Sequence, residues 1–292
     1  MTNNIAGVAR AAMLVGLNIS TYTGRKQDKR TQSEVTTSKG SGSTRAASVY
    51  KNLFADCKEL DAISKFQSRA RLHHYRLTLP WDDNGARLLP TKALMDYKAD
   101  MNRYEDEFKR LVEEFLDKYD TLVAAAAFKL GTLFDRDEYP ERHVIERKFR
   151  FEIVLSPLPT AGDFRLDIER EVQDELTAQY EKRAAAQLEI AQQDAWSRTH
   201  DVLARLKDRL TLDDNGKRRT FHDTTVTNAQ DLCSLLSTLN VTNDPSLERA
   251  RQELENAMLG VDPKELRKEE SVRSETLRKV TGVLDMFDWG DA

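Results

Sequence analysis

One apolar, β-branched run and two segments in which apolar and polar side chains alternate with a period of two predict three strands between residues 13 and 156. The segments are 13–22, which is apolar and β-branched, 74–81 and 148–156. In the third segment Phe149 and Phe151 alternate with charged residues, a pattern typical of a strand with one buried face and one wet face. We expect the three segments to pair in a small antiparallel sheet whose polar face is basic.

Apolar residues that recur every three or four positions predict three long helices, at 46–72, 91–134 and 164–212. Thr91 stands where it could cap the second of them. No Pro or Gly interrupts the third, which would be about 70 Å long if unbroken. A helix of that length usually buries its apolar stripe against another helix. The candidates are 91–134 and the same helix of a second copy.

Turn and cap signals organise the last quarter of the chain. The segment 213-DDNGKRR-219 contains the turn dipeptide Asn-Gly. Asp244 and Asp262 each precede a proline, which is favoured at the first position of a helix. Three shorter helices are therefore predicted, near 227–239, 245–259 and 262–284.

These elements predict an α+β fold that is predominantly helical. The small antiparallel sheet would pack on a long helical hairpin and be followed by a helical C-terminal region. We expect an α+β domain at 1–160 with a flexible basic loop at 24–46. A long helix or helical-hairpin arm would follow at 161–216, and a helical region with an acidic-aromatic tail at 217–292.

Charge is distributed unevenly along the chain. The 292 residues are 32% charged with a net charge of −4. Residues 1–80 contain 13 Lys and Arg against 5 Asp and Glu, whereas the remaining residues contain 32 against 44. Such separation predicts an anion-binding end and an acidic end. The alternative is that the two ends pair with each other in the folded protein or between subunits.

Cysteine content and hydropathy indicate a compartment. Cys57 and Cys233 stand far apart without a CxxC motif, so neither a disulfide framework nor a zinc site is expected. The apolar run near the N-terminus is too short for a membrane span. We expect a cytoplasmic protein, in a bacterium or a phage-infected cell, with no membrane contact.

No catalytic signature is present. The five histidines form no HExxH or Cys/His cluster, and GxxxxGK[ST], GxGxxG and GxSxG are missing from the sequence. The stretch 38-SKGSGSTR-45 has its lysine before the glycines, which is the wrong order for a phosphate-binding loop. We therefore predict no catalytic residue, no metal and no cofactor. A hydrolase or nuclease that uses scattered Asp and Glu with Mg²⁺ is the remote alternative.

The basic loop is the strongest functional signal. Lys and Arg neutralise phosphates, and aromatic rings stack on unpaired bases. A basic loop beside a sheet with basic and aromatic residues therefore predicts binding of nucleic acid, with single-stranded DNA preferred. The bland alternative is a solvated linker with ordinary surface charge. The candidate residues are Arg25, Lys26, Lys29, Arg30, Lys39, Arg45 and Arg76 for phosphates, with Tyr22 and Tyr75 for stacking.

The C-terminal tail supplies a second signal. Phe287 and Trp289 interleave with acidic residues, as in tails that recruit protein partners. We expect these two rings to bind a partner or, alternatively, to dock into the core at the end of the last helix.

The layout resembles a family of uncharacterised phage and bacterial proteins. The segments that carry the resemblance are 21-TYTGRKQDKR-30, 81-WDDNGARLLP-90, 97-YKADMNRYEDEFKRLVEEFLDKYD-120 and 261-VDPKELRKEESVR-273. Relatives are often encoded beside an AAA+ ATPase and a von Willebrand A-type protein, so the resemblance implies an adaptor or substrate role. It implies no functional residues.

Two hypotheses follow. The first is a non-enzymatic phage or mobile-element protein that binds nucleic acid through the basic N-terminal loop and self-assembles. The second is a structural or adaptor protein that forms a homo-oligomer, or binds an ATPase partner through its acidic C-terminal half, without nucleic acid.

Overall fold

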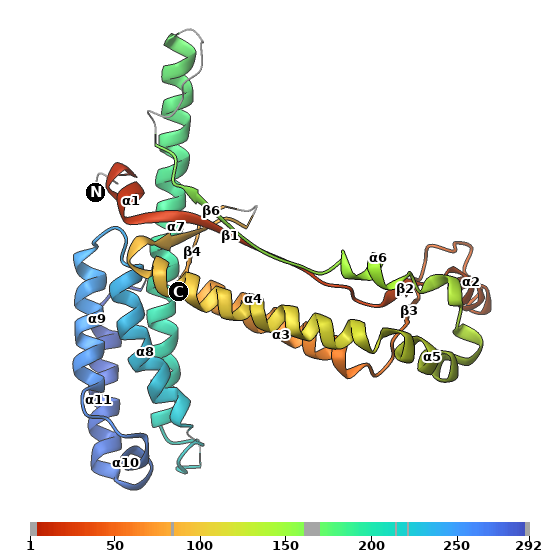
Figure 1. The fold of residues 1–292 in the computed structure, drawn as a ribbon. Helices are drawn as coiled ribbons and strands as arrows, with labels where there is room; N and C mark the ends of the chain where they lie inside the picture. Colours follow the sequence, from red (N-terminus) through yellow and green to blue (C-terminus); the bar gives the residue numbers. More distant parts are fainter. Residues whose placement is uncertain (1–4, 83–84, 161–169, 214, 221, 290–292) are drawn as a thin grey trace. The chain divides into compact units, whose positions relative to one another are not determined.

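The structure, a computed structural model, describes residues 5–82, 85–160, 170–213, 215–220 and 222–289. The fold is α+β and predominantly helical, as predicted (Figure 1). The chain divides into two compact units, which differ from the three predicted domains. Unit 1 comprises Met1–Gly16, His74–Tyr97 and Val154–Ala292, and unit 2 comprises Leu17–His73 and Lys98–Ile153. No linker marks the boundary, because four elements each contribute residues to both units. These elements are β1 (Ala12–Ser20), α3 (Lys58–Leu77), α4 (Leu94–Asp117) and β6 (Arg150–Pro157).

A bundle of long helices forms the core of unit 1. The longest, α7 (Arg170–Leu210), packs against α8 (Asp223–Leu239) and α11 (Glu270–Met286) (Figure 1). The helix α9 (Pro245–Met258) packs against α8 and α11. The expectation that the long helix pairs with 91–134 is therefore wrong, since from Ala184 onward its apolar stripe is covered by the helices that follow it in sequence. Residues 164–169 of the predicted helix lie outside the described residues.

The predicted turn and caps of the bundle are confirmed. Asp213 Oδ1 accepts hydrogen bonds from the backbone of Asn215 and Lys217. Asp244 caps α9 by accepting from the backbone N–H groups of Ser246 and Leu247. Asp262 caps α10 (Pro263–Lys268), which is separate from α11, so the single predicted helix 262–284 is two helices.

A four-stranded sheet has the order β4-β5-β1-β6, with β4 at Leu79–Pro80 and β5 at Arg87–Pro90. The antiparallel pair β5–β1 aligns Leu88 with Leu14. The strand β5 was not predicted, because four residues are too few for alternation to show. The helix α1 (Ile5–Ala11) precedes β1.

The predicted strand 74–81 is wrong over most of its length, because α3 continues to Leu77. The buried stripe of α3 runs Phe66, Ala70, His74 at a spacing of four residues. His74 is 2% exposed and shares a 2.8 Å hydrogen bond with the hydroxyl of Tyr97. A polar residue with a buried partner therefore occupies a core position, which hid the helical period and left an apparent alternation.

In unit 2, α3 and α4 run antiparallel around an aromatic core (Figure 1). Near one end Lys118 pairs with Glu59 at 2.8 Å, and further along Phe66 packs on Phe108 with centroids 5.7 Å apart. Side chains of β6 and of the segments after α4 complete this core. Its buried aromatic members are Phe54, Phe66, Phe108, Phe115, Tyr119 and Tyr139.

The predicted basic loop 24–46 is a loop only in its last part, 39–46. Most of the segment forms β2 (Arg25–Gln27) and α2 (Lys29–Ser38), and β2 pairs with β3 (Tyr50–Asn52) in a two-stranded antiparallel ribbon. Asp28 caps α2 by accepting from the Thr31 backbone N–H at 3.1 Å. The buried side of α2 consists of Gln32 and Thr36. With no apolar stripe, the helix gave no sequence signal.

Two of the predicted long helices are shorter or divided in the structure. The helix at 46–72 begins only at Lys58, because Tyr50–Asn52 is paired in the ribbon and Asp56 has a φ of +59°. The segment 91–134 divides into η1 (Thr91–Ala93), α4, α5 (Tyr119–Leu130) and η2 (Gly131–Leu133). Thr91 does not cap a helix, since its hydroxyl donates to the carbonyl of Ala11.

Candidate nucleic-acid interface

The β2–β3 ribbon of unit 2 has two faces of different chemistry. Arg25 lies opposite Asn52 and Gln27 opposite Tyr50, while Lys26 lies opposite Lys51 between them. Directly opposed residues of an antiparallel pair share a face, and successive residues alternate. Arg25, Gln27, Tyr50 and Asn52 therefore share one side, which we call the ribbon face. Lys26 and Lys51 share the other side.

On the side opposite the ribbon face, two lysines form ion pairs with a carboxylate of the same unit. Lys51 Nζ lies 2.5 Å and Lys26 Nζ 3.7 Å from the carboxylate of Glu138, which belongs to η3 (Arg136–Glu138). The Lys51 side chain is 10% exposed and also donates to the carbonyl of Leu133. These two lysines thus hold the ribbon to the rest of unit 2. Lys26, a predicted phosphate ligand, already has a carboxylate partner.

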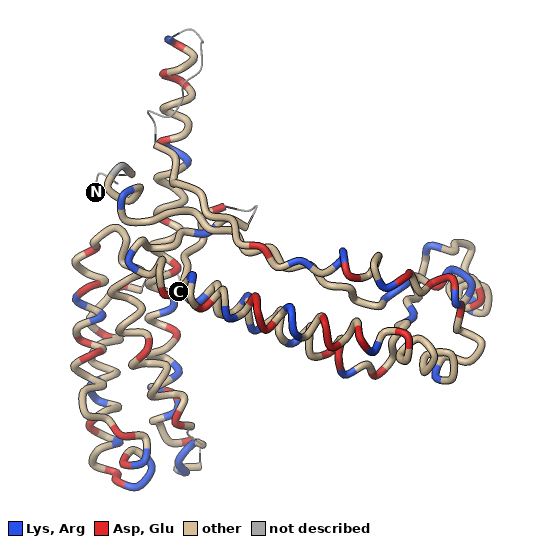
Figure 2. The backbone as a smooth tube through the Cα atoms, in the orientation of Figure 1, with Lys and Arg blue, Asp and Glu red and all other residues tan. Residues whose placement is uncertain are grey.

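The remaining predicted cations of 24–46 are solvent-exposed. Arg30 pairs with Glu34 within α2, yet its side chain is 88% exposed. Within the described part of the chain, four of the cations have no ion-pair partner. These four, which we call the free cations, are Arg25, Lys29, Lys39 and Arg45. Figure 2 shows Lys and Arg positions gathered over β2 and α2.

A groove of about 360 Å³ opens beside the ribbon face, between the ribbon and α3. Its polar lining comes from Thr21, Thr23, Arg25, Asn52, Asp61, Ser64 and Gln67, and its remaining lining from Tyr22, Phe54, Cys57, Leu60 and Ile63. Gly24 fixes the turn at the ribbon's start with a φ of +63°, and a Cβ there would lie 3.2 Å from the Phe54 ring. Asn52 Oδ1 accepts from the Phe54 backbone N–H at 3.2 Å. The groove and the ribbon face therefore share Arg25 and Asn52.

Tyr22 lines the groove, but its ring packs against other residues of unit 2. Its ring meets Phe54 edge to face at 6.2 Å, and the Lys148 ammonium lies 5.8 Å from its centroid. Burial, with smaller contributions from Tyr119 and Tyr139, raises the pKa of the Tyr22 hydroxyl well above its usual value. A ring held on these sides has little surface for stacking on a base.

Arg76 and Tyr75 belong to unit 1 and to helix α3, so the strand that was expected to present them does not exist there. Arg76 pairs with Asp231 at 3.5 Å, and the guanidinium of Arg87 lies 4.9 Å from the centroid of the Tyr75 ring. Arg87 also donates to the hydroxyl and carbonyl oxygens of Thr78. Both predicted site residues thus have contacts within unit 1.

The C-terminal rings are docked, which was the alternative to partner binding. Phe287 and Trp289 pack on Trp196 of α7, with centroids 5.8 and 5.4 Å away. The indole N–H of Trp289 donates to the carbonyl of Leu284 at 2.7 Å. The bundle of unit 1 therefore uses both rings as core side chains.

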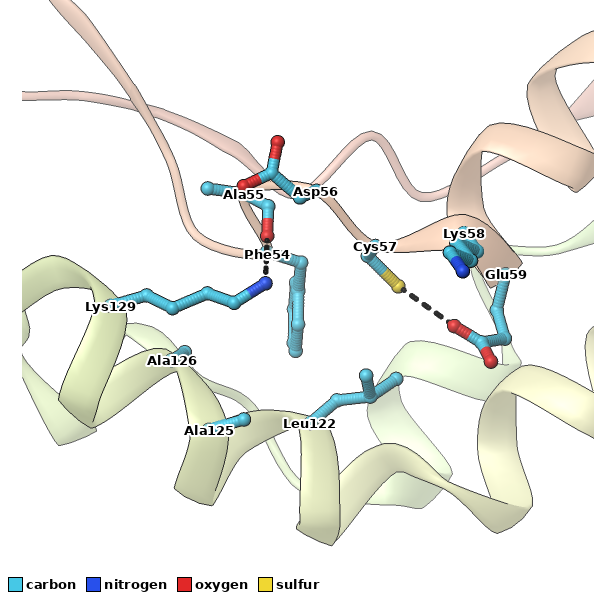
Figure 3. Close-up of a pocket in the computed structure, with 10 residues that line it drawn as sticks. All are labelled: Phe54, Ala55, Asp56, Cys57, Lys58, Glu59, Leu122, Ala125, Ala126 and Lys129. Atoms are coloured by element: carbon cyan, nitrogen blue, oxygen red, sulfur yellow. Dashed lines mark hydrogen bonds between the residues drawn. The ribbon is translucent and has the colours of Figure 1, made fainter.

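A second cavity, of about 180 Å³, lies between α5 and the start of α3 (Figure 3). Lys129 Nζ donates to the carbonyl of Ala55 at 3.1 Å, and the Cys57 thiol donates to Glu59 at 3.5 Å. Burial, together with the Glu59 carboxylate, raises the pKa of the Cys57 thiol. Cys57 thus stays protonated at neutral pH and is a poor nucleophile. Cys233 is also buried and free.

Sequence reasoning missed two residues of the ribbon face. Tyr50 is 64% exposed, and Asn52 is exposed beside it. Both had been placed in a helix, since Val49, Leu53 and Cys57 recur at helical spacing. The alternation of Tyr50, Lys51 and Asn52 is too short to reveal a strand without its partner.

Two further findings concern the described residues. None of their helices is long and apolar enough to cross a membrane. Among them, no group of three or more His, Cys, Asp or Glu is arranged to hold a metal ion.

Comparisons with known proteins returned nothing: no family model, no curated protein and no solved structure matches this chain.

Proposed function

We propose that this protein binds single-stranded nucleic acid, with DNA as the preferred ligand, through the ribbon face and the free cations of unit 2. The observation that carries the proposal is the state of Arg25. Its guanidinium is exposed and has no ion-pair partner among the described residues, and it shares a face with the 64% exposed ring of Tyr50. A guanidinium for a phosphate beside a ring for a base is the minimal arrangement for a single strand.

The charge balance of the two units supports the same assignment. Unit 2 contains 22 Lys and Arg against 19 Asp and Glu, whereas unit 1 contains 23 against 30. A polyanion is attracted to the unit with positive net charge and repelled by the other. Within unit 2 the excess comes from the segment 24–45, which has six cations and two acids.

The test is fluorescence anisotropy with a fluorescein-labelled oligothymidylate of about 20 nucleotides, which is long enough to cover a single-strand site. We expect Arg25→Ala to weaken binding about fivefold, since one phosphate contact is lost. Tyr50→Ala should weaken binding about tenfold through lost stacking. Lys26→Ala is the matched control: it removes one charge from the neighbouring residue, but on the side that faces Glu138. Equal losses for Arg25→Ala and Lys26→Ala would contradict the ribbon-face assignment, and absence of binding at low salt would remove the proposal.

A second candidate function, assembly into a homo-oligomer, has its own observation. The first fourteen residues of α7, from Arg170 to Arg183, include no buried residue, although Val172 and Leu176 continue the apolar stripe. Val172 is 44% exposed. Pairing of two such ends would bury this stripe. Light scattering should then report a defined oligomer that Val172→Glu dissociates, and a monomer at high concentration would exclude it.

A further inference from the structure

The groove beside the ribbon face has two walls with complementary charge. The ribbon wall includes the basic Arg25 and the amide residue Asn52, while the α3 wall includes the acidic Asp61 and the hydroxyl residue Ser64. Asp61 and Ser64 are three residues apart and therefore lie on one side of α3. All of these residues belong to unit 2. A ligand that spans the groove meets positive charge on one side and negative charge on the other.

Some polar groups that line the groove already have partners within the protein, and the others remain available to a ligand. Gln67 is occupied, because its amide donates to the carbonyl of Ile19 at 3.0 Å. Asn52 uses its oxygen internally, so its NH₂ group is what remains for a ligand. Asp61 has no ion-pair partner among the residues that the structure describes. The groove thus offers an acceptor pair on α3 and donors on the ribbon.

The apolar part of the lining favours a flat ligand. Leu60 precedes Asp61 on α3 and is partly exposed, so it gives the groove an apolar patch above the buried Ile63 and Phe54. A nucleobase has an apolar face, a polar edge and a phosphate one sugar away. The groove of about 360 Å³ falls within the usual size of small-molecule sites.

The carboxylate discriminates among bases. An ionised carboxylate only accepts hydrogen bonds, and its two oxygens receive two parallel N–H donors. Guanine has two such donors side by side on its pairing edge, N1–H and N2–H. Adenine and cytosine have one amino group there, and thymine has one N–H flanked by two carbonyl oxygens that a carboxylate repels. The expected order is guanine first and thymine last.

Resting on the proposed function, we infer that the groove is a base subsite that takes one guanine of the bound strand. Asp61 receives the guanine N–H pair, the Asn52 amide donates to an acceptor of the base, and Arg25 binds the adjacent phosphate.

The test compares three labelled oligonucleotides of the same length on the full-length protein. One is oligothymidylate, one carries a single central deoxyguanosine, and one carries deoxyinosine, which lacks the N2 amino group. We expect the guanine oligonucleotide to bind about tenfold more tightly than oligothymidylate, with inosine between them. Asp61→Asn should abolish this ratio, because an amide cannot accept both donors.

The matched control is Asp56→Asn, which removes the same charge from a residue that lines the other cavity. Asn tolerates the positive φ found at this position. This variant should keep the tenfold ratio even if its affinity for all three oligonucleotides rises slightly.

The outcomes separate the two claims. Equal affinities for the three oligonucleotides, with binding that still depends on Arg25 and Tyr50, would overturn the guanine subsite and leave the proposed function standing. Retention of the ratio in Asp61→Asn would also overturn the subsite. Failure of all three oligonucleotides to bind would overturn both.

Discussion

Arg273 in unit 1 and Arg25 in unit 2 are both arginines, but one is buried with hydrogen-bond partners and the other is exposed. Arg273 is 2% exposed, and its guanidinium donates to the carbonyls of Leu210 at 2.8 Å and Arg209 at 2.7 Å. Arg25 is exposed on the ribbon with no carboxylate within ion-pair distance among the described residues. The first closes the last turn of α7, and the second stabilises nothing that the structure shows. A cation in unit 1 can stabilise the fold, while the free cations of unit 2 remain available to a ligand.

The charged residues around the two arginines also differ. Between residues 245 and 279 the bundle has eight Lys and Arg and eight Asp and Glu. Several pair within one helix turn, as Arg251 does with Glu248 and Glu255. The segment 24–45 has six cations and two acids, and one of those acids, Asp28, caps α2. The exposed cations of 24–45 therefore have fewer acids beside them in the sequence than the exposed cations of the bundle.

The largest expected effect is on the buried guanidinium. Arg273→Ala should lower the free energy of unfolding by about 3 kcal/mol, since two carbonyls lose their donor and a cavity is left. Urea unfolding followed by circular dichroism measures the change. Arg278→Ala, an exposed position in the same helix, is the control and should cost less than about 0.5 kcal/mol. Equal costs for the two variants would mean that Arg273 does not hold the end of α7.

The next effect concerns two Asp-Pro caps of the bundle. Asp244 is 8% exposed, caps α9 and also accepts from Gln192 and the indole N–H of Trp196. Asp244→Ala should cost about 2 kcal/mol, because the cap and two further hydrogen bonds are lost.

Asp262 is exposed and caps the short α10 by one backbone hydrogen bond, at 2.8 Å. Asp262→Ala should therefore cost about 1 kcal/mol or less. Thermal unfolding of both variants provides the comparison, and a larger loss at Asp262 would contradict the stabilisation ascribed to the two additional hydrogen bonds of Asp244.

An effect of about the same size as that at Asp244 is expected at the start of the ribbon. Gly24→Ala should cost about 2 kcal/mol, from the positive φ and from the contact that the new methyl group makes with Phe54. Gly40 has a similar φ, +65°, but nothing within 4 Å of its added Cβ, so Gly40→Ala should cost about 1 kcal/mol. Urea titration separates the two, and identical costs would show that crowding at Gly24 is relieved by movement of the ring.

The smallest effect on stability is expected at Arg25. Arg25→Ala should change the free energy of unfolding by less than about 0.5 kcal/mol, as for other exposed side chains without partners. Together with the loss of affinity expected for the same variant, this result would mark Arg25 as a ligand-binding residue. A destabilisation as large as that of Arg273→Ala would instead give Arg25 a structural role.

Sequence patterns predicted the elements with long repeats and missed those with short or polar ones. The helix α7 was visible because apolar residues recur at helical spacing along its 41 residues, and Asp244-Pro245 marked the start of α9. The ribbon was hidden because β2 and β3 have three residues each and lie on either side of a helix whose buried residues are Gln32 and Thr36.

The candidate site shows the same limit. The composition of 24–45 identified its cations, but it did not show which of them have a carboxylate partner in the folded protein. Lys26 differs from Arg25 only through the ribbon register, which turns it toward Glu138, a residue more than a hundred positions away. The groove depends on Asp61 of α3 and Asn52 of the ribbon lining the same cavity, which no local pattern encodes.

The central claim is that the free cations of unit 2, and not exposed cations in general, bind the polyanion. The most direct measurement is the salt dependence of oligothymidylate affinity for two fourfold variants with equal charge change. One variant replaces Arg25, Lys29, Lys39 and Arg45 by Gln, and the other replaces four exposed residues of unit 1, Arg249, Lys264, Lys268 and Arg278. For wild type and the unit 1 variant, the slope of log affinity against log salt should be about −3, as expected for four phosphate contacts to a single strand. The unit 2 variant should lose most of that slope, and equal slopes in all three proteins would contradict the account.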